Sequence, residues 1–379
     1  MEARRTPLYD LIVAAGARMI EFGGWDMPLQ FSGIRDEHGA VRSLAGIFDL
    51  SHMGRLEVTG ESASELLQWV LTNDLTKLEV GDAQYTLLCQ EEGGILDDLV
   101  LYRLDQQRFW LVVNAANTAK DLAWLETHRP PGVEVTDITD RTALLAIQGP
   151  CSQELIARLG GGLEQLGYFK CRQAVLDGVE CVVARTGYTG EDGFEIVCAG
   201  RDAARMWTGL GDLRLAGRRP LPCGLGARDV LRLEAGLKLY GMDMDEKTCP
   251  YEVGLGWVVR LKKGEFIGRE ALEQLYHAGP SREAVGLRML DRNVPRHGCR
   301  VTKGGRPIGK ITSGTYSFSL NQGVAMAMVQ AAYCRVGQGV GVEIRGHTSP
   351  AEIIKTPFYR GSVRTHSGAG WSAHVDQGA

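Results

Sequence analysis

Two adjacent carboxylates stand in the middle of an apolar run. Residues 91–102 read EEGGILDDLVLY, so Asp97 and Asp98 follow a Gly-Gly turn inside a predicted strand. Side chains alternate between the faces of a strand, and here neither face is otherwise polar. We therefore expect both faces to be covered and at least one acid to lie in apolar surroundings. Such a carboxylate can have a structural role, in which it stabilises a turn or pairs with a structural arginine. Alternatively, it binds a cationic or proton-donating ligand.

A further carboxylate follows a glycine-rich stretch, RTGYTGEDGFEI, at residues 185–196. The glycine spacing is not that of a nucleotide-binding loop, and a strand follows where such a loop needs a helix. We interpret the glycines as a turn between strands. Glu195 lies inside the second strand, and a planar carboxylate can accept two parallel N–H donors. This chemistry would bind the amino-pyrimidine edge of a purine or a pterin.

Two arginines lie at the start of a predicted helix, GARDVLRLEAGLKLYG, at residues 226–241. Arg228 falls in the first turn, where the helix dipole opposes a positive charge. Arg232 is four residues further on and shares its face. The pair is expected to bind acidic partners or an anionic ligand, with a surface salt bridge as the alternative.

The segment FDLSHMG at residues 48–54 places Ser51 beside His52. Neighbours on an extended segment point to opposite sides, and no third group is indicated, so the pattern argues against a serine hydrolase. Met53 is predicted to pack, either in the core or against a flat ligand.

The composition describes an ordinary globular protein. The 379 residues are enough for two or three domains, and hydrophobic residues make up 44% of them. The net charge of -4 provides no positive surface for nucleic acid or an anionic membrane. No apolar run is long enough to span a bilayer. We expect neither kind of partner.

The nine cysteines are scattered and lack the spacing of a zinc or iron–sulfur site. This favours a reducing compartment and no metal. The opening residues, MEARRTP, do not have the layout of a signal peptide, so we expect a cytoplasmic location.

Helical and strand patterns alternate along the chain. Tight turns at residues 91–94 and 105–107 predict an antiparallel meander of the strands 85–90, 95–102 and 109–113. Closely spaced short strands after residue 282 predict a small barrel or jelly roll. The remaining predicted elements are helices at 8–15, 62–71, 118–126, 202–213 and 227–237, and strands at 143–147, 171–176, 179–185 and 194–198.

Taken in order, these segments resemble one family, the aminomethyltransferases or T-proteins of the glycine cleavage system. The resemblance extends to about Tyr359. It is carried by RTPLYD (5–10), FGGWDMPLQF (22–31), FDLSHMG (48–54), GGILDDLV (93–100), VVNAAN (112–117), QGP (148–150), TGYTGEDGFE (186–195), ARDVLRLEAGLKLYG (227–241) and TSG (312–314).

The resemblance implies an α+β, multi-domain fold: a three-domain cloverleaf of antiparallel sheets with a C-terminal β-barrel or jelly roll. Residues 1–50 and 135–275 would form a discontinuous folate-binding domain, and residues 51–134 an inserted α+β domain carrying the catalytic aspartate. The barrel would span residues 283–360, and residues 361–379 would be a flexible tail.

The resemblance also implies the reaction. The aminomethyl group carried on the dihydrolipoyl arm of the H-protein is transferred to tetrahydrofolate, which yields ammonia and 5,10-methylenetetrahydrofolate. Tetrahydrofolate would be a co-substrate, the lipoyl group would come from the H-protein, and no metal is implied.

Site residues follow from the family's motifs. The second acid of GGILDDL is the catalytic one, which is Asp98 here, and Asp97 on the reverse face is assigned to structure. In a dry pocket Asp98 could orient a folate nitrogen, accept its proton or stabilise a developing cation, and these three roles stay open. Glu195 and Arg228 match folate contacts. The positions that line the folate pocket are Met53, Tyr85, Val100, Tyr102, Asn114 and Tyr188.

Two departures from the family pattern stand near the C-terminus. Val363 lies near the place of a ligand-contacting tyrosine that some members have, and Tyr359 is not an assured substitute. Phe318 replaces a proline, which we expect to affect only a local turn.

Two related functions compete with this interpretation. One is a folate-dependent demethylase, although such modules often accompany a flavin domain for which this chain has no room. The other is a non-enzymatic folate-binding protein of iron–sulfur assembly. Its characteristic K-G-C-[FY]-x-G-Q-E pattern is missing from the corresponding segment, KLYGMDMDEKTCPYEVGL, at residues 238–255.

Overall fold

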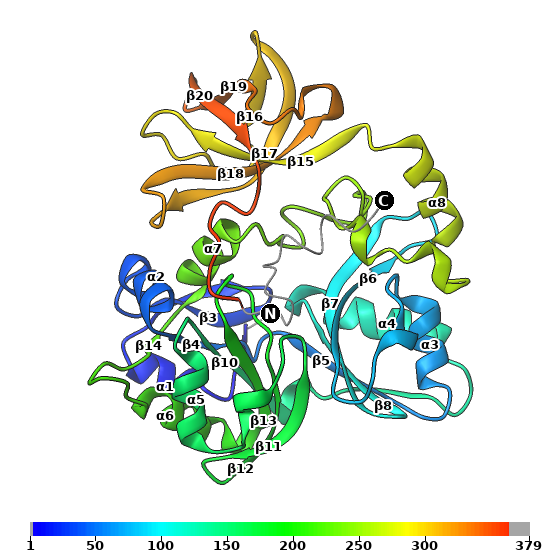
Figure 1. Ribbon diagram of the computed structural model, residues 1–379, viewed down its shortest axis with the longest axis vertical. Coiled ribbons are helices and arrows are strands. Elements are labelled where there is room, and N and C mark those ends of the chain that lie inside the picture. Colours follow the sequence, from blue (N-terminus) through cyan, green and yellow to red (C-terminus); the bar gives the residue numbers. More distant parts are fainter. Residues whose placement is uncertain (1–2, 364–379) are drawn as a thin grey trace.

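Three open sheets and one closed barrel organise residues 3–363, the part of the chain that the computed structural model describes. Figure 1 shows three lobes: one built mainly from the blue and green segments, one cyan, and one running from yellow to red. The mixed α+β class and the C-terminal barrel predicted from the sequence are therefore confirmed. Most of the predicted flexible tail, from residue 364 onward, lies outside the described residues.

The first lobe is built on a six-stranded sheet in the order β11-β12-β13-β10-β4-β14, antiparallel except between β14 and β4. Every residue of β4 is buried, because helices and a second lobe cover both faces of the sheet. The strands are β4 (Gly46–Asp49), β10 (Thr142–Gln148), β11 (Cys171–Leu176), β12 (Val179–Ala184), β13 (Gly193–Ala199) and β14 (Leu221–Pro222).

A small three-stranded sheet, β1 (Arg4–Arg5), β2 (Arg18–Phe22) and β3 (Trp25–Gln30), lies beside the first lobe. Gly23 and Gly24 connect β2 to β3 with φ of 58° and 83°, which glycine adopts without strain and a two-residue hairpin turn of this type requires. The motif FGGWDMPLQF is thus a hairpin, a structure that its turn-forming residues alone did not reveal.

Helices of the first lobe cover its sheets. α6 buries Ala203, Met206, Trp207 and Leu210, which recur at helical spacing and pack into the core over β10. α7 packs against α2 and β3 and also contacts strand β17 of the barrel. The helices are α1 (Tyr9–Ala14), α2 (Ile34–Ser43), α5 (Ser152–Ile156), α6 (Ala203–Asp212) and α7 (Leu225–Glu234).

The second lobe is a fully antiparallel five-stranded sheet in the order β6-β7-β8-β5-β9. The predicted meander of β6, β7 and β8 is confirmed. Since β9 joins this sheet, the lobe extends to residue 137. Its elements are β5 (Gly54–Thr59), β6 (Ala83–Cys89), β7 (Ile95–Asp105), β8 (Arg108–Val113), β9 (Glu134–Asp137), α3 (Ala63–Val70) and α4 (Thr118–His128).

Strand β7 is covered on both faces, as its sequence predicts. Leu99 and Leu101 belong to the core beneath α3 and α4. Val100 and Tyr102 face a different core, which includes Leu144 of the first lobe. The strand therefore separates two apolar layers, and its polar residues must find partners inside the protein.

The third lobe is a closed barrel in the order β15-β18-β17-β16-β19-β20. Helix α8 (Arg269–Ala278) leads into it from the second lobe, as Figure 1 shows. The strands are β15 (Arg282–Met289), β16 (Arg300–Lys303), β17 (Arg306–Ser317), β18 (Gln322–Gln330), β19 (Gly339–Ile344) and β20 (His347–Ile354).

Three helices, α2, α5 and α8, have no counterpart among the predicted elements. α2 reads IRDEHGAVRS and buries two polar residues, Glu37 and His38, alongside Val41. Its inward face mixes polar and apolar side chains, so buried polar contacts contribute to its stability beside the packing of Val41.

All nine cysteines are free thiols. Within residues 3–363, no helix combines the length and the apolar character needed to cross a bilayer.

Candidate active site

Asp98 lies on β7 with both carboxylate oxygens hydrogen-bonded. Tyr85 on the neighbouring strand donates its hydroxyl to Oδ2 at 2.9 Å, and the side-chain amide of Asn114 donates to Oδ1 at 2.9 Å. The structure thus brings three of the predicted site residues into direct contact. Asp98 keeps part of its surface exposed, so a ligand can reach the carboxylate that these two donors hold in place.

The pKa of Asp98 is raised to about 7, first by burial and then by the neighbouring charge of Asp97. The hydrogen bonds from Tyr85 and Asn114 act in the opposite direction because they stabilise the ionised form. A carboxyl group with such a pKa exists in both protonation states near neutral pH, which suits it to proton transfer.

Asp97 is fully buried and anchors the backbone that carries the site. Its Oδ1 accepts hydrogen bonds from the side chains of Asn114 at 2.8 Å and Asn117 at 2.6 Å, and its Oδ2 accepts the Asn114 backbone N–H at 3.0 Å. The structural role predicted for Asp97 fits these contacts. Asn117 was not singled out from the sequence, although the motif VVNAAN contains it.

The Tyr85 ring is itself held by an aromatic neighbour. Trp257 stacks on it with a centroid distance of 5.9 Å and an interplanar angle of 22°. Trp257 lies in a short 3-10 helix, Gly256–Val258, far along the chain. Sequence reasoning missed this tryptophan because nothing local to residue 257 indicates contact with residue 85.

Glu195 lies at the other end of the same site, facing Tyr102. Its Oε2 accepts hydrogen bonds from the hydroxyls of Thr186 at 2.5 Å and Tyr102 at 3.2 Å. Among the described residues, no donor contacts Oε1, and Glu195 is 9% exposed. One oxygen of this carboxylate therefore remains available to a ligand.

Asp98, Val100 and Tyr102 share one face of β7, at intervals of two residues. Strand geometry places the Cα atoms of Asp98 and Tyr102 about 13 Å apart, so Glu195, which contacts Tyr102, is reached farther along the strand than Asp98. Met53, Val100 and Phe169 pack against the apolar core that contains Tyr102. Phe169 was not predicted, and its φ of 55° is unusual for a residue with a side chain.

Arg228 contributes a positive charge to the site. Its guanidinium lies 4.6 Å from the ring centroid of Tyr188 and, among the described residues, forms no hydrogen bond or ion pair. Burial lowers its pKa, although nearby Tyr188 and Glu195 favour the charged form. Arg232, by contrast, is paired with Asp243 at 2.6 Å and Asp229 at 2.8 Å. The two arginines therefore differ in their partners. Arg232 is already paired with acidic side chains, and of the two only Arg228 is free to bind an anionic ligand.

His52 is buried near Arg228, and its Nδ1 has no hydrogen-bond partner within residues 3–363. Burial, with Arg228 and Arg55, lowers its pKa to about 3, so the imidazole is neutral at physiological pH. The Ser51 hydroxyl instead bonds to the backbone of Leu144, donating to its carbonyl at 3.3 Å and accepting from its N–H at 3.1 Å. These contacts do not form a nucleophile–base pair.

Two family models match the chain in succession. The GCVT N-terminal domain matches residues 8–263, and the glycine cleavage T-protein C-terminal barrel domain matches residues 282–360. The chain belongs to the glycine cleavage T-protein family.

Known T-proteins resemble the chain over almost its whole length. An aminomethyltransferase of Symbiobacterium thermophilum is 48% identical, covering 95% of this chain and 98% of that protein. One from Geobacillus kaustophilus is 47% identical, covering 94% and 99%. The crystal structure of the glycine cleavage system aminomethyltransferase T from Bartonella henselae superimposes with a TM-score of 0.90 at 37% identity, covering 95% and 99%.

A buried ion cluster connects the first lobe of this T-protein family member to the barrel. Glu234 on α7 accepts hydrogen bonds from His38 at 2.9 Å, Arg42 at 2.8 Å and the Ser317 hydroxyl at 2.6 Å. Phe318 packs edge-on against His38 with a centroid distance of 5.3 Å. The expectation that Phe318 affects only a local turn is therefore wrong, because its ring reaches α2.

The segment after the barrel returns to the first lobe and supports the glycine-rich loop. The Ser362 backbone N–H and hydroxyl donate to Glu191 at 2.8 and 2.6 Å, and the Asp192 backbone N–H donates to the Ser362 hydroxyl at 3.1 Å. Arg42 lies 4.1 Å from the ring centroid of Tyr359. Figure 1 shows this red segment running from the barrel down to the first lobe.

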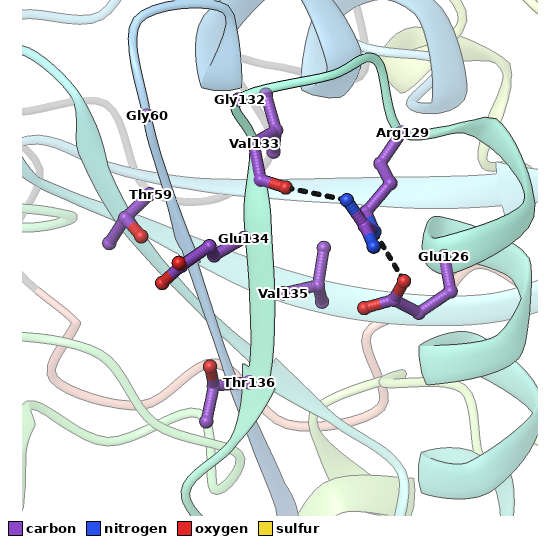
Figure 2. Close-up of a pocket in the computed structure, with 9 residues that line it drawn as sticks. All are labelled: Thr59, Gly60, Glu126, Arg129, Gly132, Val133, Glu134, Val135 and Thr136. Carbon is purple, nitrogen blue, oxygen red and sulfur yellow. Dashed lines mark hydrogen bonds and ion pairs between the residues drawn. The ribbon is translucent and has the colours of Figure 1, made fainter.

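A separate pocket of about 570 Å³ lies at the edge of the second lobe, beside β9. Figure 2 shows that Arg129 within it donates to the Val133 carbonyl and to the Glu126 carboxylate. Arg129 and Glu126 are thus paired with each other, and none of the predicted site residues lines the pocket. The lining residues are Thr59, Gly60, Glu126, Arg129, Gly132, Val133, Glu134, Val135 and Thr136.

Proposed function

We propose that the chain is the tetrahydrofolate-dependent aminomethyltransferase of the glycine cleavage system. It converts the S-aminomethyldihydrolipoyl H-protein and tetrahydrofolate to dihydrolipoyl H-protein, 5,10-methylenetetrahydrofolate and ammonia. The observation that carries the proposal is the half-buried Asp98 carboxylate, held by Tyr85 and Asn114 in a chain that matches T-proteins over almost its whole length.

The site's polar groups fit tetrahydrofolate. An amino-pyrimidine ring presents N–H donors, which the open Oε1 of Glu195 can accept. A glutamate tail presents carboxylates, which the unpaired guanidinium of Arg228 can bind. Met53, Val100, Tyr102 and Tyr188 supply apolar and aromatic walls for a flat, elongated molecule.

Asp98 is the catalytic residue in this proposal. Bound tetrahydrofolate supplies the nitrogens that take up the transferred carbon. Tyr85 and Asn114 each donate to one oxygen of Asp98, so the carboxylate is held in a single orientation. With a pKa near 7, Asp98 can accept a proton at neutral pH and return it later in the cycle.

The lipoylated H-protein is the proposed partner, and it presents the dihydrolipoyl arm to this site. The proposal includes a cytoplasmic location, which is consistent with nine cysteines that are all free. It also divides the chain into a discontinuous folate domain (1–50 and 138–275), an inserted domain (51–137, including β9) and a barrel (283–360). The separate cores of the second lobe and of the barrel support this division.

The decisive experiment measures ammonia release and 5,10-methylenetetrahydrofolate formation from aminomethylated H-protein, with and without tetrahydrofolate. We expect fast, folate-dependent release by the wild-type chain. Asp98→Asn should be slow, whereas Asp105→Asn, the same change at an exposed position of β7, should behave as the wild type. A folded chain that binds folate but releases no ammonia would overturn the proposal and favour a demethylase or a folate-binding assembly protein.

A further inference from the structure

Asp121 is a fully buried acid without an ordinary partner. It lies in the first turn of α4 and is 0% exposed. Neither of its carboxylate oxygens accepts a hydrogen bond from any donor within residues 3–363. An ionised carboxylate in such a place would carry a large desolvation penalty with nothing to offset it.

The geometry of α4 directs this side chain at Asp97. Asn117 precedes Asp121 by four residues, so the two side chains lie on the same face of the helix. The Asn117 amide contacts Asp97 Oδ1 at 2.6 Å. The carboxyl group of Asp121 comes within hydrogen-bonding reach of the same Asp97 carboxylate. Two carboxyl groups can form a hydrogen bond only if one of them holds a proton.

The charges around Asp121 explain why the shared proton is held by Asp121 and not by Asp97. Asp97 and Asp98 on β7 face it with negative charge, and Lys120 on its own helix opposes them. The Lys120 ammonium is directed away, toward Glu246 at 2.9 Å and Tyr240 at 3.1 Å. Burial, followed by the charge of Asp97, raises the pKa of Asp121 to about 10. Asp97, with three N–H donors of its own, is the better-stabilised anion.

The contacts of Asp97 lead directly to the catalytic carboxylate. One side-chain amide, that of Asn114, donates to Asp97 Oδ1 at 2.8 Å and to Asp98 Oδ1 at 2.9 Å. The orientation of Asn114 therefore depends on where Asp97 stands.

We propose that Asp121 is a positioning residue: its protonated carboxyl donates a hydrogen bond to Asp97, which fixes Asn114 and, through it, the orientation of Asp98. The catalytic meaning of this arrangement rests on the proposed function of Asp98. The protonated state of Asp121 does not, because it follows from burial and contacts alone.

Two substitutions of Asp121 distinguish its role as a hydrogen-bond donor from its ability to ionise. Asp121→Asn keeps an N–H donor toward Asp97 but cannot ionise, and we expect turnover within about threefold of the wild type. Asp121→Ala removes the donor, and we expect kcat to fall about tenfold with an unchanged KM for tetrahydrofolate, since only the orientation of Asp98 is disturbed. Equal losses in both variants, or wild-type kcat in a folded Asp121→Ala protein, would overturn the positioning role.

A pH titration followed by the ¹³C resonances of the aspartate carboxyl groups tests whether Asp121 is protonated, and it needs no catalytic turnover. We expect one carboxyl to stay protonated well above neutral pH in the wild type and to be missing in Asp121→Asn. The Asp98 resonance, identified by its loss in Asp98→Asn, should titrate near pH 7 in the wild type and in Asp121→Asn. In Asp121→Ala it should move by about 0.5 pH unit or more. Unmoved Asp98 titration there, or no high-pH carboxyl in the wild type, would overturn the proposal.

The pH dependence of unfolding gives an independent readout. In the unfolded chain an aspartate ionises at about pH 4, whereas Asp121 is expected to keep its proton in the folded chain. The folded protein therefore loses stability as the pH rises above about 4. Relative to Asp121→Asn, the wild-type equilibrium constant for unfolding should therefore grow about tenfold per pH unit between about pH 5 and 8. Parallel curves for the two proteins would show that Asp121 is ionised in the folded chain. If the wild type transferred no aminomethyl group, the proposed function would be wrong. The ¹³C titration and the pH dependence of unfolding would still show whether Asp121 is protonated in the folded chain.

Discussion

The side-chain amide of Asn114 donates hydrogen bonds to both Asp97 and Asp98, at 2.8 and 2.9 Å. Adjacent residues of a strand normally point to opposite faces, so one group seldom contacts both. The pairing of β6 with β7 shifts register between Leu88 and Cys89, opposite Asp97 and Ile95. Such an irregularity commonly bends a strand, and here it lies beside the two carboxylates that converge on one amide.

Asp98→Asn should leave folding and tetrahydrofolate binding intact while lowering kcat about 10²-fold, the usual loss when one preorganised electrostatic contact is removed. Thermal unfolding, folate titration and single-turnover ammonia release measure the three properties. Full activity in a correctly folded Asp98→Asn protein would rule out a catalytic role for this residue.

The pH profile should show whether Asp98, whose pKa is about 7, acts in its ionised form. If the carboxylate accepts a proton or stabilises positive charge, kcat/KM falls as pH drops below about 7, because the group is then protonated. Asp97→Asn removes the neighbouring charge that raises this pKa, so the acid limb should move to lower pH. An acid limb that stays in place would show that another group controls it.

Tyr85→Phe tests the hydroxyl that contacts Asp98. The hydrogen bond at 2.9 Å stabilises the ionised carboxylate, so its loss should raise the pKa of Asp98 and move the acid limb to higher pH. The ring and its stacking on Trp257 remain, and folate binding should change little. Movement in the opposite direction from Asp97→Asn would be a consistent signature, and identical shifts in both variants would contradict this electrostatic account.

Much of the architecture could be predicted because its signals are local. Strand β7 is predicted by the apolar run between the turns at residues 91–94 and 105–107. Closely spaced turns after residue 282 predict the barrel. The site required more than local pattern. Trp257 against Tyr85 and Tyr102 against Glu195 join segments far apart in the sequence. Helix α2 buries Glu37 and His38, which a search for apolar spacing does not count. The family resemblance, rather than spacing, indicated Asp98 as the catalytic acid.

Glu195→Ala should act on binding rather than on chemistry. Glu195 offers an open oxygen at the far end of the site from Asp98, so its removal should raise KM and the dissociation constant for tetrahydrofolate with a smaller effect on kcat. Glu180→Ala on the neighbouring strand β12 is the matched control, because that side chain is exposed. An unchanged folate affinity in Glu195→Ala would show that this carboxylate is not a folate contact.

Gly361→Ala should loosen the segment that supports the glycine-rich loop. A Cβ at residue 361 would lie 2.2 Å from the Gly190 carbonyl oxygen and 2.8 Å from the Glu191 carboxylate, so the segment must move away. We expect the free energy of unfolding to fall by about 1–3 kcal/mol, the typical cost of overpacking, together with weaker folate binding as Tyr188 in that loop loses support. Gly339→Ala is the control, since a Cβ there would meet no atom within 4 Å. Equal stabilities of the two variants, measured by denaturant unfolding, would mean that residues 359–362 do not support the loop.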